Sequence, residues 1–181
     1  MIIVFTGEGK GKTTAAIGTG IRAVGSGKKV LMIQFMKVKE RSSESKVLES
    51  IDGFDIYSFG REGFFLPDEE LRKNPELIDK GFKPFSYIDF HLAEEGISFV
   101  EKNAENYELI ILDEVCVAVH YKLLDIKRVL DLLDRFREKI FILTGRYCDE
   151  KIIYLSDLVT EMREIKHYFR KGVKAVKGID F

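Results

Sequence analysis

The turn formed by residues 7–14, with the sequence GEGKGKTT, constrains the fold of this chain more than any other segment. It follows residues 2–5, a run of β-branched and aromatic residues that is typical of a buried strand in a parallel sheet. Apolar residues then recur at helical spacing up to Gly25, where glycine and serine end the pattern. A glycine-rich turn between a buried strand and a helix predicts an α/β fold, in which helices cover a parallel sheet.

The residue types in this turn predict a site for a chain of phosphates. Glycines allow backbone N–H groups to turn inward around anionic oxygens, and the start of the following helix adds further donors. Lys12 would neutralise phosphate charge, and the hydroxyl of Thr13 would bind Mg²⁺. Only three residues separate Gly7 from the Gly11–Lys12 pair, whereas the standard phosphate loop has four. An ordinary strand-to-helix turn is therefore the competing interpretation.

Strand-like and helix-like segments alternate along the rest of the chain. Further strands are expected at residues 30–35, 54–59, 109–112, 140–143, 158–162 and 173–176. Helices are expected over residues 90–100 and from an Asp125 cap to residue 136. We predict one domain, residues 1–181, of the P-loop (RecA-like) α/β class, with three layers and a mostly parallel sheet. The polar segment 36–84, which holds all three prolines, is expected to form an irregular lid within about residues 37–85.

Charge and cysteine content exclude several classes of protein. The chain has 29 basic and 30 acidic residues, so it lacks the overall positive field of a protein that binds nucleic acid or an anionic membrane. Its apolar runs are too short for a signal peptide or a membrane span. Two cysteines, Cys116 and Cys148, cannot build a disulfide framework, and Cys116 with His120 supplies too few ligands for zinc. We expect a cytoplasmic protein without nucleic-acid or membrane partners.

Polar residues that follow two later strands are candidates for the same site. Asp113 and Glu114 end a buried strand, the place where phosphate-loop enzymes hold Mg²⁺ through an acid. Arg146 ends the next strand and would grip phosphate oxygens if the sheet is parallel. The competing interpretations are an exposed acidic pair, and a surface ion pair of Arg146 with Asp149 or Glu150.

Taken together, these motifs resemble one family. Residues 6–16 (TGEGKGKTTAA), 112–114 (LDE), 144–146 (TGR), 157–162 (DLVTEM) and the ending 172–181 are similar to the ATP:corrinoid adenosyltransferases of the CobA/BtuR type. The likeness is weakest over residues 38–84. The three-residue spacing of the phosphate loop, which departs from the standard motif, is the spacing of this family.

The resemblance implies a reaction and assigns residues to it. The Co(I) of a corrinoid (cobalamin, cobinamide or cobyrinic acid a,c-diamide) attacks the 5′ carbon of ATP, and triphosphate leaves intact. Catalysis is expected from Lys12, Arg146 and Glu114. Mg²⁺ is expected on Thr13, Glu114 and Asp113. The residues expected to bind the nucleotide and the corrinoid are Gly7, Glu8, Gly9, Lys10, Gly11, Lys12, Thr13, Thr14, Lys37 and Phe64.

The lid is expected to cover the corrinoid. In the family, aromatic residues of this region press on the lower face of the corrinoid and displace its axial ligand, which eases reduction of the cobalt, and Phe64 matches one such position. Relatives often carry a Trp two residues on, where this chain has Leu66. The alternative is that these residues only fix the lid to the core. Many relatives also carry an N-terminal extension over the corrinoid, whereas this sequence begins at the first strand.

Two other classes of function stay open at this point. One is a P-loop NTPase or small-molecule kinase that cleaves the terminal phosphate, and the other is a nucleotide-binding regulatory module without turnover. Adenosylation produces triphosphate and a cobalt–carbon bond, an NTPase produces ADP and phosphate, and the module produces neither. The expected partners are a reductant, such as a flavodoxin-like protein, and a second copy of the chain in a homodimer.

Overall fold

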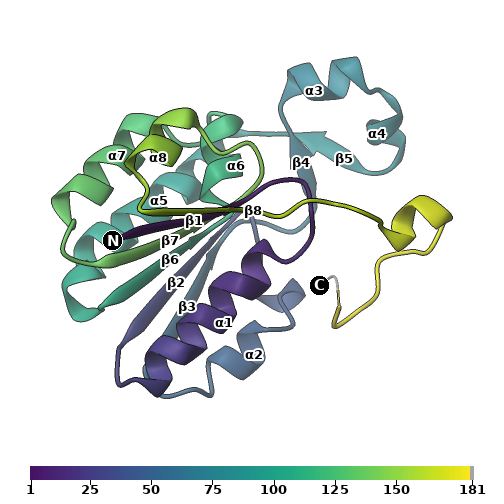
Figure 1. Cartoon of the computed structure of the whole chain (residues 1–181). Coiled ribbons are helices and arrows are strands. Elements are labelled where there is room, and N and C mark those ends of the chain that lie inside the picture. Colours follow the sequence, from purple (N-terminus) through teal and green to yellow (C-terminus); the bar gives the residue numbers. More distant parts are fainter. Residues whose placement is uncertain (180–181) are drawn as a thin grey trace.

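The computed structural model describes residues 1–179 and is built on a six-stranded sheet (Figure 1). Its strands are β1 (Ile2–Thr6), β2 (Val30–Phe35), β3 (Phe54–Phe59), β6 (Leu109–Asp113), β7 (Ile140–Thr144) and β8 (Leu158–Glu161). Their order is β3-β2-β6-β7-β1-β8, and every neighbouring pair is parallel. The predicted α/β class is therefore confirmed, and all six carboxyl ends meet at one edge of the sheet.

Helices cover both faces of the sheet and complete three layers (Figure 1). One face carries α1 (Lys12–Gly25) and α2 (Ser45–Leu48), and the other carries α5 (Tyr87–Asn103), α6 (Val115–His120), α7 (Ile126–Arg135) and α8 (Glu150–Leu155). Strand β2 shows why helices must cover both faces of the sheet. All six of its residues are buried, with Met32 in the core under α1 and Ile33 in the core under α5. Apolar side chains on both sides of a strand leave no face for water.

Side-chain caps fix where several helices begin. Asp125 caps α7 by accepting a hydrogen bond from the backbone N–H of Lys127 at 2.9 Å, as the sequence predicts. Asp149 caps α8 through the N–H of Lys151 at 2.8 Å. Helix α5 begins with a capping box between Ser86 and Asp89. Within residues 1–179, no helix combines the length and the apolarity that a membrane crossing requires.

The prediction of a strand over residues 173–176 is wrong. The chain leaves β8, forms the short helix η3 (Tyr168–Lys171), and then runs without regular structure as far as residue 176. These residues are exposed and lie away from the sheet, so no neighbouring strand offers them backbone partners. The two valines of this segment, Val173 and Val176, are therefore not sufficient for a strand here.

The segment between β2 and α5 is more regular than predicted. After η1 (Lys39–Arg41) and α2, strand β3 joins the main sheet, and a small body then projects from it (Figure 1). We call this body the lid subdomain, residues 60–86. Strands β4 (Phe64–Leu66) and β5 (Phe82–Pro84) pair in parallel within it, and α3 (Asp68–Lys73) and α4 (Glu76–Asp79) connect them. The prolines do not prevent structure, because Pro67 and Pro75 directly precede the two helices and Pro84 ends β5.

The lid subdomain is attached to α5 by a charged contact. The Arg61 guanidinium donates to both oxygens of Asp89, with Nε–Oδ1 and Nη2–Oδ2 distances of 2.7 and 2.6 Å. The same guanidinium lies over the ring of Phe65, 3.5 Å from its centroid. Burial opposes ionisation of Asp89, but hydrogen bonds from Arg61 and Ser86 outweigh it and hold the pKa of Asp89 below its ordinary value.

The short helix η2 (Ala104–Asn106) follows α5 and leads into β6.

Candidate active site

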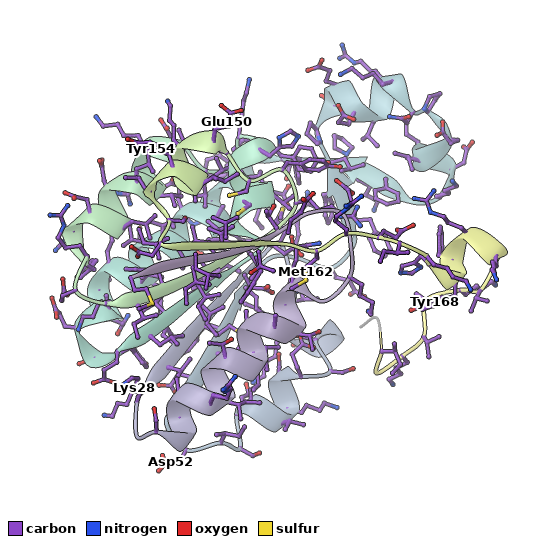
Figure 2. The ribbon with its side chains drawn as sticks, viewed as in Figure 1. Lys28, Asp52, Glu150, Tyr154, Met162 and Tyr168 are labelled. Atoms are coloured by element: carbon purple, nitrogen blue, oxygen red, sulfur yellow. The ribbon has the colours of Figure 1, made fainter. Side chains whose placement is uncertain are left out.

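The phosphate loop, residues 7–11, connects β1 to α1 at the carboxyl edge of the sheet. Gly7 and Gly11 have φ values of 94° and 116°, which suit glycine. The N–H of Gly9 donates to the carbonyl oxygen of Met162 at 2.6 Å, and Figure 2 shows Met162 where the chain leaves β8. A Cβ on Gly7 would lie 2.5 Å from that same oxygen. The loop therefore needs glycine for its packing against the end of β8 as well as for any ligand.

Lys12 lies within the curve of the phosphate loop. Its ammonium donates to the carbonyl oxygens of Gly7 and Gly9 at 2.7 and 2.8 Å, and the residue is only 8% exposed. Burial and the nearby Arg146 lower the pKa of Lys12 from its ordinary value, while three neighbouring carboxylates oppose that shift. A buried cation at a helix start, in a loop of backbone N–H groups, suits a polyphosphate.

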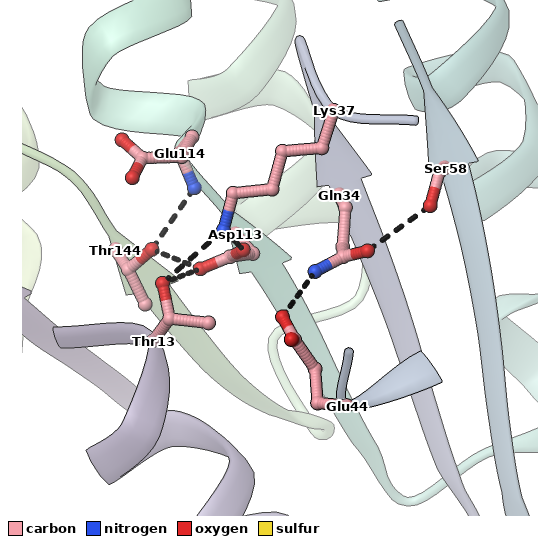
Figure 3. Close-up of polar contacts among 8 residues, drawn as sticks. All are labelled: Thr13, Gln34, Lys37, Glu44, Ser58, Asp113, Glu114 and Thr144. Carbon is pink, nitrogen blue, oxygen red and sulfur yellow. Dashed lines mark hydrogen bonds and ion pairs between the residues drawn. The ribbon is translucent and has the colours of Figure 1, made fainter. Parts of the chain in front are cut away.

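Asp113, at the end of β6, organises the floor of the site (Figure 3). It is fully buried, and its Oδ1 accepts hydrogen bonds from the hydroxyls of Thr13 and Thr144 at 2.8 and 2.7 Å. Its Oδ2 accepts from the Lys37 ammonium at 2.7 Å. Both oxygens are thus engaged within the protein. The prediction that Asp113 itself binds Mg²⁺ stays a prediction, and any direct ligation must compete with these contacts.

Lys37 reaches this floor from the segment after β2. Burial would lower the pKa of Lys37, but Asp113 and Glu114 outweigh burial and raise it above its ordinary value. Lys37 is therefore an ammonium in the folded protein. The sequence predicts Lys37 beside the substrate, and the structure places its charge against Asp113.

The carboxylate of Glu114, which follows Asp113 in the chain, lines the cleft. The residue adopts a left-handed conformation with φ 63°, and its N–H donates to the Thr144 hydroxyl at 2.9 Å. Burial and the adjacent Asp113 raise the pKa of Glu114. Among residues 1–179, no group donates a hydrogen bond to its carboxylate. A desolvated carboxylate that lacks a partner fits Mg²⁺, which takes one or two carboxylates and keeps water and phosphate as its other ligands.

Arg146 follows β7 and lines the same cleft. Its Nε lies 3.4 Å from Oε2 of Glu8, and its Nη2 donates to the Glu8 carbonyl at 3.4 Å. The ion pair is thus made with the phosphate loop, and not with Asp149 or Glu150. Gly145 places Arg146 close to α6, because a Cβ on Gly145 would lie 2.9 Å from Cβ of Cys116. The long contacts to Glu8 leave the guanidinium able to take a better acceptor.

The phosphate loop and the lid subdomain border one cleft of about 1720 Å³. Small-molecule sites usually measure roughly 300–1,000 Å³, so this cleft has room for more than one ligand. Of the predicted binding residues, those from Glu8 to Thr14, Lys37 and Phe64 all line it. Gly7 lies at the base of the loop, where it accepts from Lys12.

Phe64 gives the lid side of the cleft an apolar surface. It is 56% exposed, and its ring centroid is 5.3 Å from that of Phe82. Phe65 lies under Arg61 instead, and Leu66 is partly buried. Phe65 and Leu66 therefore fasten the lid subdomain, whereas Phe64 is left facing the cleft. This arrangement favours a contact of Phe64 with substrate over a purely structural role.

Comparison with known proteins decides between the open functions. The family described as ATP:corrinoid adenosyltransferase BtuR/CobO/CobP matches residues 1–181. The chain belongs to this family. The corrinoid adenosyltransferase of Escherichia coli K12 is 37% identical, over 100% of this chain and 85% of that protein. The corrinoid adenosyltransferase CobA of Salmonella typhimurium LT2 is 36% identical over the same shares. Among solved structures, flagellar accessory protein FlaH of Methanocaldococcus jannaschii is similar with a TM-score of 0.47 and 13% identity, over 88% of this chain and 69% of that chain.

Family membership confirms the predicted enzyme class. The protein is an ATP:corrinoid adenosyltransferase, with ATP and a corrinoid as its substrates. Nothing favours the alternative of terminal phosphate cleavage or of a regulatory module.

Several residues of the candidate site escaped the sequence analysis. Thr144 bridges Asp113 and the backbone of Glu114, and its place at the end of a central strand was the available signal. The segment after β8 also lines the cleft, through Glu164, His167, Phe169, Arg170, Ala175, Lys177, Gly178 and Ile179. The sequence analysis missed this part of the lining because it predicted a strand at residues 173–176, and a strand would belong to the sheet and not to the wall of the cleft. The resemblance of the tail to the family was the signal that pointed to a role.

Proposed function

We propose that the phosphate loop holds the triphosphate of ATP so that the 5′ carbon faces the corrinoid in the same cleft. The observation that carries this proposal is the Lys12 ammonium, which lies inside the loop within 2.8 Å of two carbonyl oxygens. Among residues 1–179, its direct contacts are with carbonyl dipoles and not with a carboxylate. A triphosphate can therefore form an ion pair with the desolvated ammonium of Lys12, and no existing ion pair with a carboxylate has to break first.

This reaction needs positioning and charge stabilisation more than acid–base chemistry. The electron pair of Co(I) forms the bond to the 5′ carbon as the C5′–O bond breaks, and the bonding pair leaves on the triphosphate. No proton has to move in this step. Lys12 and Arg146 are the residues we assign to the charge that develops on the leaving oxygen.

We assign Mg²⁺ to Glu114 and Thr13, on the evidence of the unpartnered carboxylate described above. When bound, the ion would neutralise phosphate oxygens and help to orient the triphosphate. Thr13 would have to turn its lone pairs to the ion while it keeps its hydrogen bond to Asp113. Asp113 would then act through Thr13 as a positioning residue.

The corrinoid is proposed to bind between the phosphate loop and the lid subdomain, with Phe64 against its lower face. The exposed ring of Phe64 and the size of the cleft support this placement. An apolar group in this position would displace the lower axial ligand, and four-coordinate cobalt is easier to reduce. A flavodoxin-like protein or another reductant would supply the electron, and we propose a cytoplasmic homodimer as the working form.

A direct test uses cobalamin reduced to Co(I), ATP and Mg²⁺ under anaerobic conditions. The expected products are a light-sensitive cobalt–carbon bond and one triphosphate for each cobalt alkylated. Cobalamin kept as Co(III) is the control, and it should give neither product. Formation of ADP and phosphate without the cobalt–carbon bond would contradict the proposal.

A further inference from the structure

The Lys37 ammonium occupies a position that phosphate-loop enzymes normally give to a metal. Its Nζ lies 2.7 Å from Oδ2 of Asp113 and 3.4 Å from the hydroxyl of Thr13 (Figure 3). In phosphate-loop NTPases the matching hydroxyl and acid hold Mg²⁺ between them. Here the hydroxyl donates directly to the acid, and an ammonium contacts both groups.

The backbone holds Lys37 in this place. Met36 turns the chain at the end of β2 with φ 58°, and its N–H donates to the Phe59 carbonyl at 3.0 Å. Gly60 lies so close that a Cβ on it would be 2.4 Å from the backbone nitrogen of Lys37. The lysine side chain therefore starts from a packed turn between two strand ends, and its reach toward Asp113 follows from the ends of β2 and β3.

A divalent cation on Asp113 would conflict with this lysine. Mg²⁺ binds oxygen at about 2.0–2.1 Å, so an ion on Oδ2 would lie within roughly 5 Å of the ammonium, which is 2.7 Å from the same atom. The other oxygen already accepts from Thr13 and Thr144. Two cations so close in a buried site repel strongly. A metal on Asp113 is therefore disfavoured as long as Lys37 is in place.

We propose that Lys37 is a built-in cation that takes the place of a metal on Asp113 and keeps divalent ions away from that carboxylate. This inference rests on the proposed function, in which the metal lies on Glu114, Thr13 and the triphosphate and not on Asp113. The arrangement that places Mg²⁺ for cleavage of a terminal phosphate is then missing. Lys37 is thus a specificity-determining residue that directs reaction to the C5′–O bond of ATP.

Binding of Mn²⁺ without nucleotide tests the inference, with free Mn²⁺ followed by electron paramagnetic resonance. Four proteins are compared: wild type, Lys37→Met, the double variant Lys37→Met/Asp113→Asn, and Lys28→Met as a control. Lys28 is exposed and lies beyond the far end of α1 from the phosphate loop (Figure 2). Loss of the competing ammonium should raise Mn²⁺ affinity about tenfold or more in Lys37→Met, as metal sites respond to their surroundings on that scale.

The double variant and the control identify the site. Lys37→Met/Asp113→Asn should lose the gained affinity, because the freed carboxylate is gone, and Lys28→Met should match the wild type. Equal affinities of Lys37→Met and wild type overturn the inference. So does a gain that survives in the double variant. A second readout is ADP formed from ATP and Mg²⁺ without corrinoid, which should rise in Lys37→Met.

A measurement on intact wild-type protein covers the case in which Lys37→Met does not fold. Lysine labelled with ¹⁵N should give a slowly exchanging ammonium signal that Lys37→Arg removes. That signal should persist when Mg²⁺ and ATP are added, and its loss on addition would overturn the inference. Adenosylation is assayed separately on the wild type. Absence of adenosylation together with the expected Mn²⁺ pattern would remove the proposed function and leave the exclusion of metal by Lys37 intact.

Discussion

The carboxyl edge of the main sheet and the lid subdomain border the same cleft but are held in place differently. At the sheet edge, the fully buried Asp113 accepts three hydrogen bonds from groups on three separate segments of the chain. In the lid subdomain, Phe64 is more than half exposed, and the attachment to α5 is the partly exposed pair of Arg61 and Asp89. One side is fixed by buried polar contacts, and the other by the charged contact of Arg61 with Asp89 and by ring packing.

The difference suits the two substrates. A triphosphate has a fixed shape and a high charge, so a rigid set of donors stabilises it best. A corrinoid is large and changes its axial coordination. The lid surface that contacts it therefore benefits from being able to shift relative to the sheet. We therefore expect substitutions at the sheet edge to lower the rate with every corrinoid, and substitutions in the lid subdomain to alter the preference among corrinoids.

The largest effect is expected from Lys12→Ala. Loss of the desolvated ammonium should lower the rate of adenosylation by about 100-fold or more, the scale seen when one donor to a developing charge is removed. The rate is measured as triphosphate formed from Co(I)-cobalamin and ATP, and circular dichroism checks the fold. Lys28→Ala is the matched control and should leave the rate unchanged. Near-full activity of Lys12→Ala would show that the triphosphate binds elsewhere.

A smaller loss is expected from Arg146→Ala, because this guanidinium is half exposed and only loosely paired with Glu8. We expect a decrease of about tenfold in kcat/KM, or about 1.4 kcal/mol, close to the lower end of the range for a hydrogen bond to a charged group. Arg146→Lys should recover part of this loss, since it keeps the charge without the two-pronged geometry. The decrease should be alike for cobalamin and cobinamide, and a decrease confined to one of them would place Arg146 on the corrinoid instead.

Phe64→Ala tests the lid side of the comparison. Adenosylation of complete cobalamin should slow by about fivefold, the order of an aromatic contact, because the ring no longer competes with the lower axial ligand. Cobinamide, which lacks that ligand, should react at nearly the wild-type rate. Phe82→Ala removes the ring that packs against Phe64. It distinguishes a direct contact of Phe64 with the corrinoid from a role of this ring pair in supporting the lid subdomain. Equal slowing of both corrinoids by Phe64→Ala would exclude the proposed role.

The smallest effect is expected from Asp89→Asn, which keeps the shape of the side chain but removes its charge. The melting temperature should fall by a few degrees, which corresponds to about 1 kcal/mol in a protein of this size. Because the pKa of Asp89 is lower in the folded state than in the unfolded state, its contribution is present above pH ~4 and is lost as the pH falls through the folded value. The difference between variant and wild type should therefore shrink in acid. A difference that stays constant down to pH ~3 would show that the charge of Asp89 does not matter.

The sequence predicted the sheet well because its strands carry strong local signals. Buried runs such as residues 30–35 and 109–112 fit only strands that are covered on both faces. The sequence predicted a lid in this region but not its regular structure, because β4 and β5 have three residues each and depend on one another for backbone partners. Their pairing is a long-range contact that no short segment specifies. The strand expected at residues 173–176 failed for the same reason, since these residues lie away from the sheet and pair with none of its strands.

The site was predicted to the extent that residue types near strand ends reveal it. The sequence placed Lys12, Glu114 and Arg146 at one edge, and the structure brings them together. It did not predict that Asp113 would be enclosed by Thr13, Thr144 and Lys37, because enclosure depends on the distances between strand ends. Whether each of these residues has its proposed role stays a prediction for the experiments above.

The two ends of the described chain lie at very different places relative to the cleft. The ammonium of Met1 donates to the Lys139 carbonyl at the amino edge of the sheet, whereas Ile179 lines the cleft itself. A purification tag or a surface-attachment linker added beyond Ile179 would crowd the entrance used by a molecule as large as a corrinoid. Fusions and immobilised preparations of this enzyme should therefore be built from its amino end.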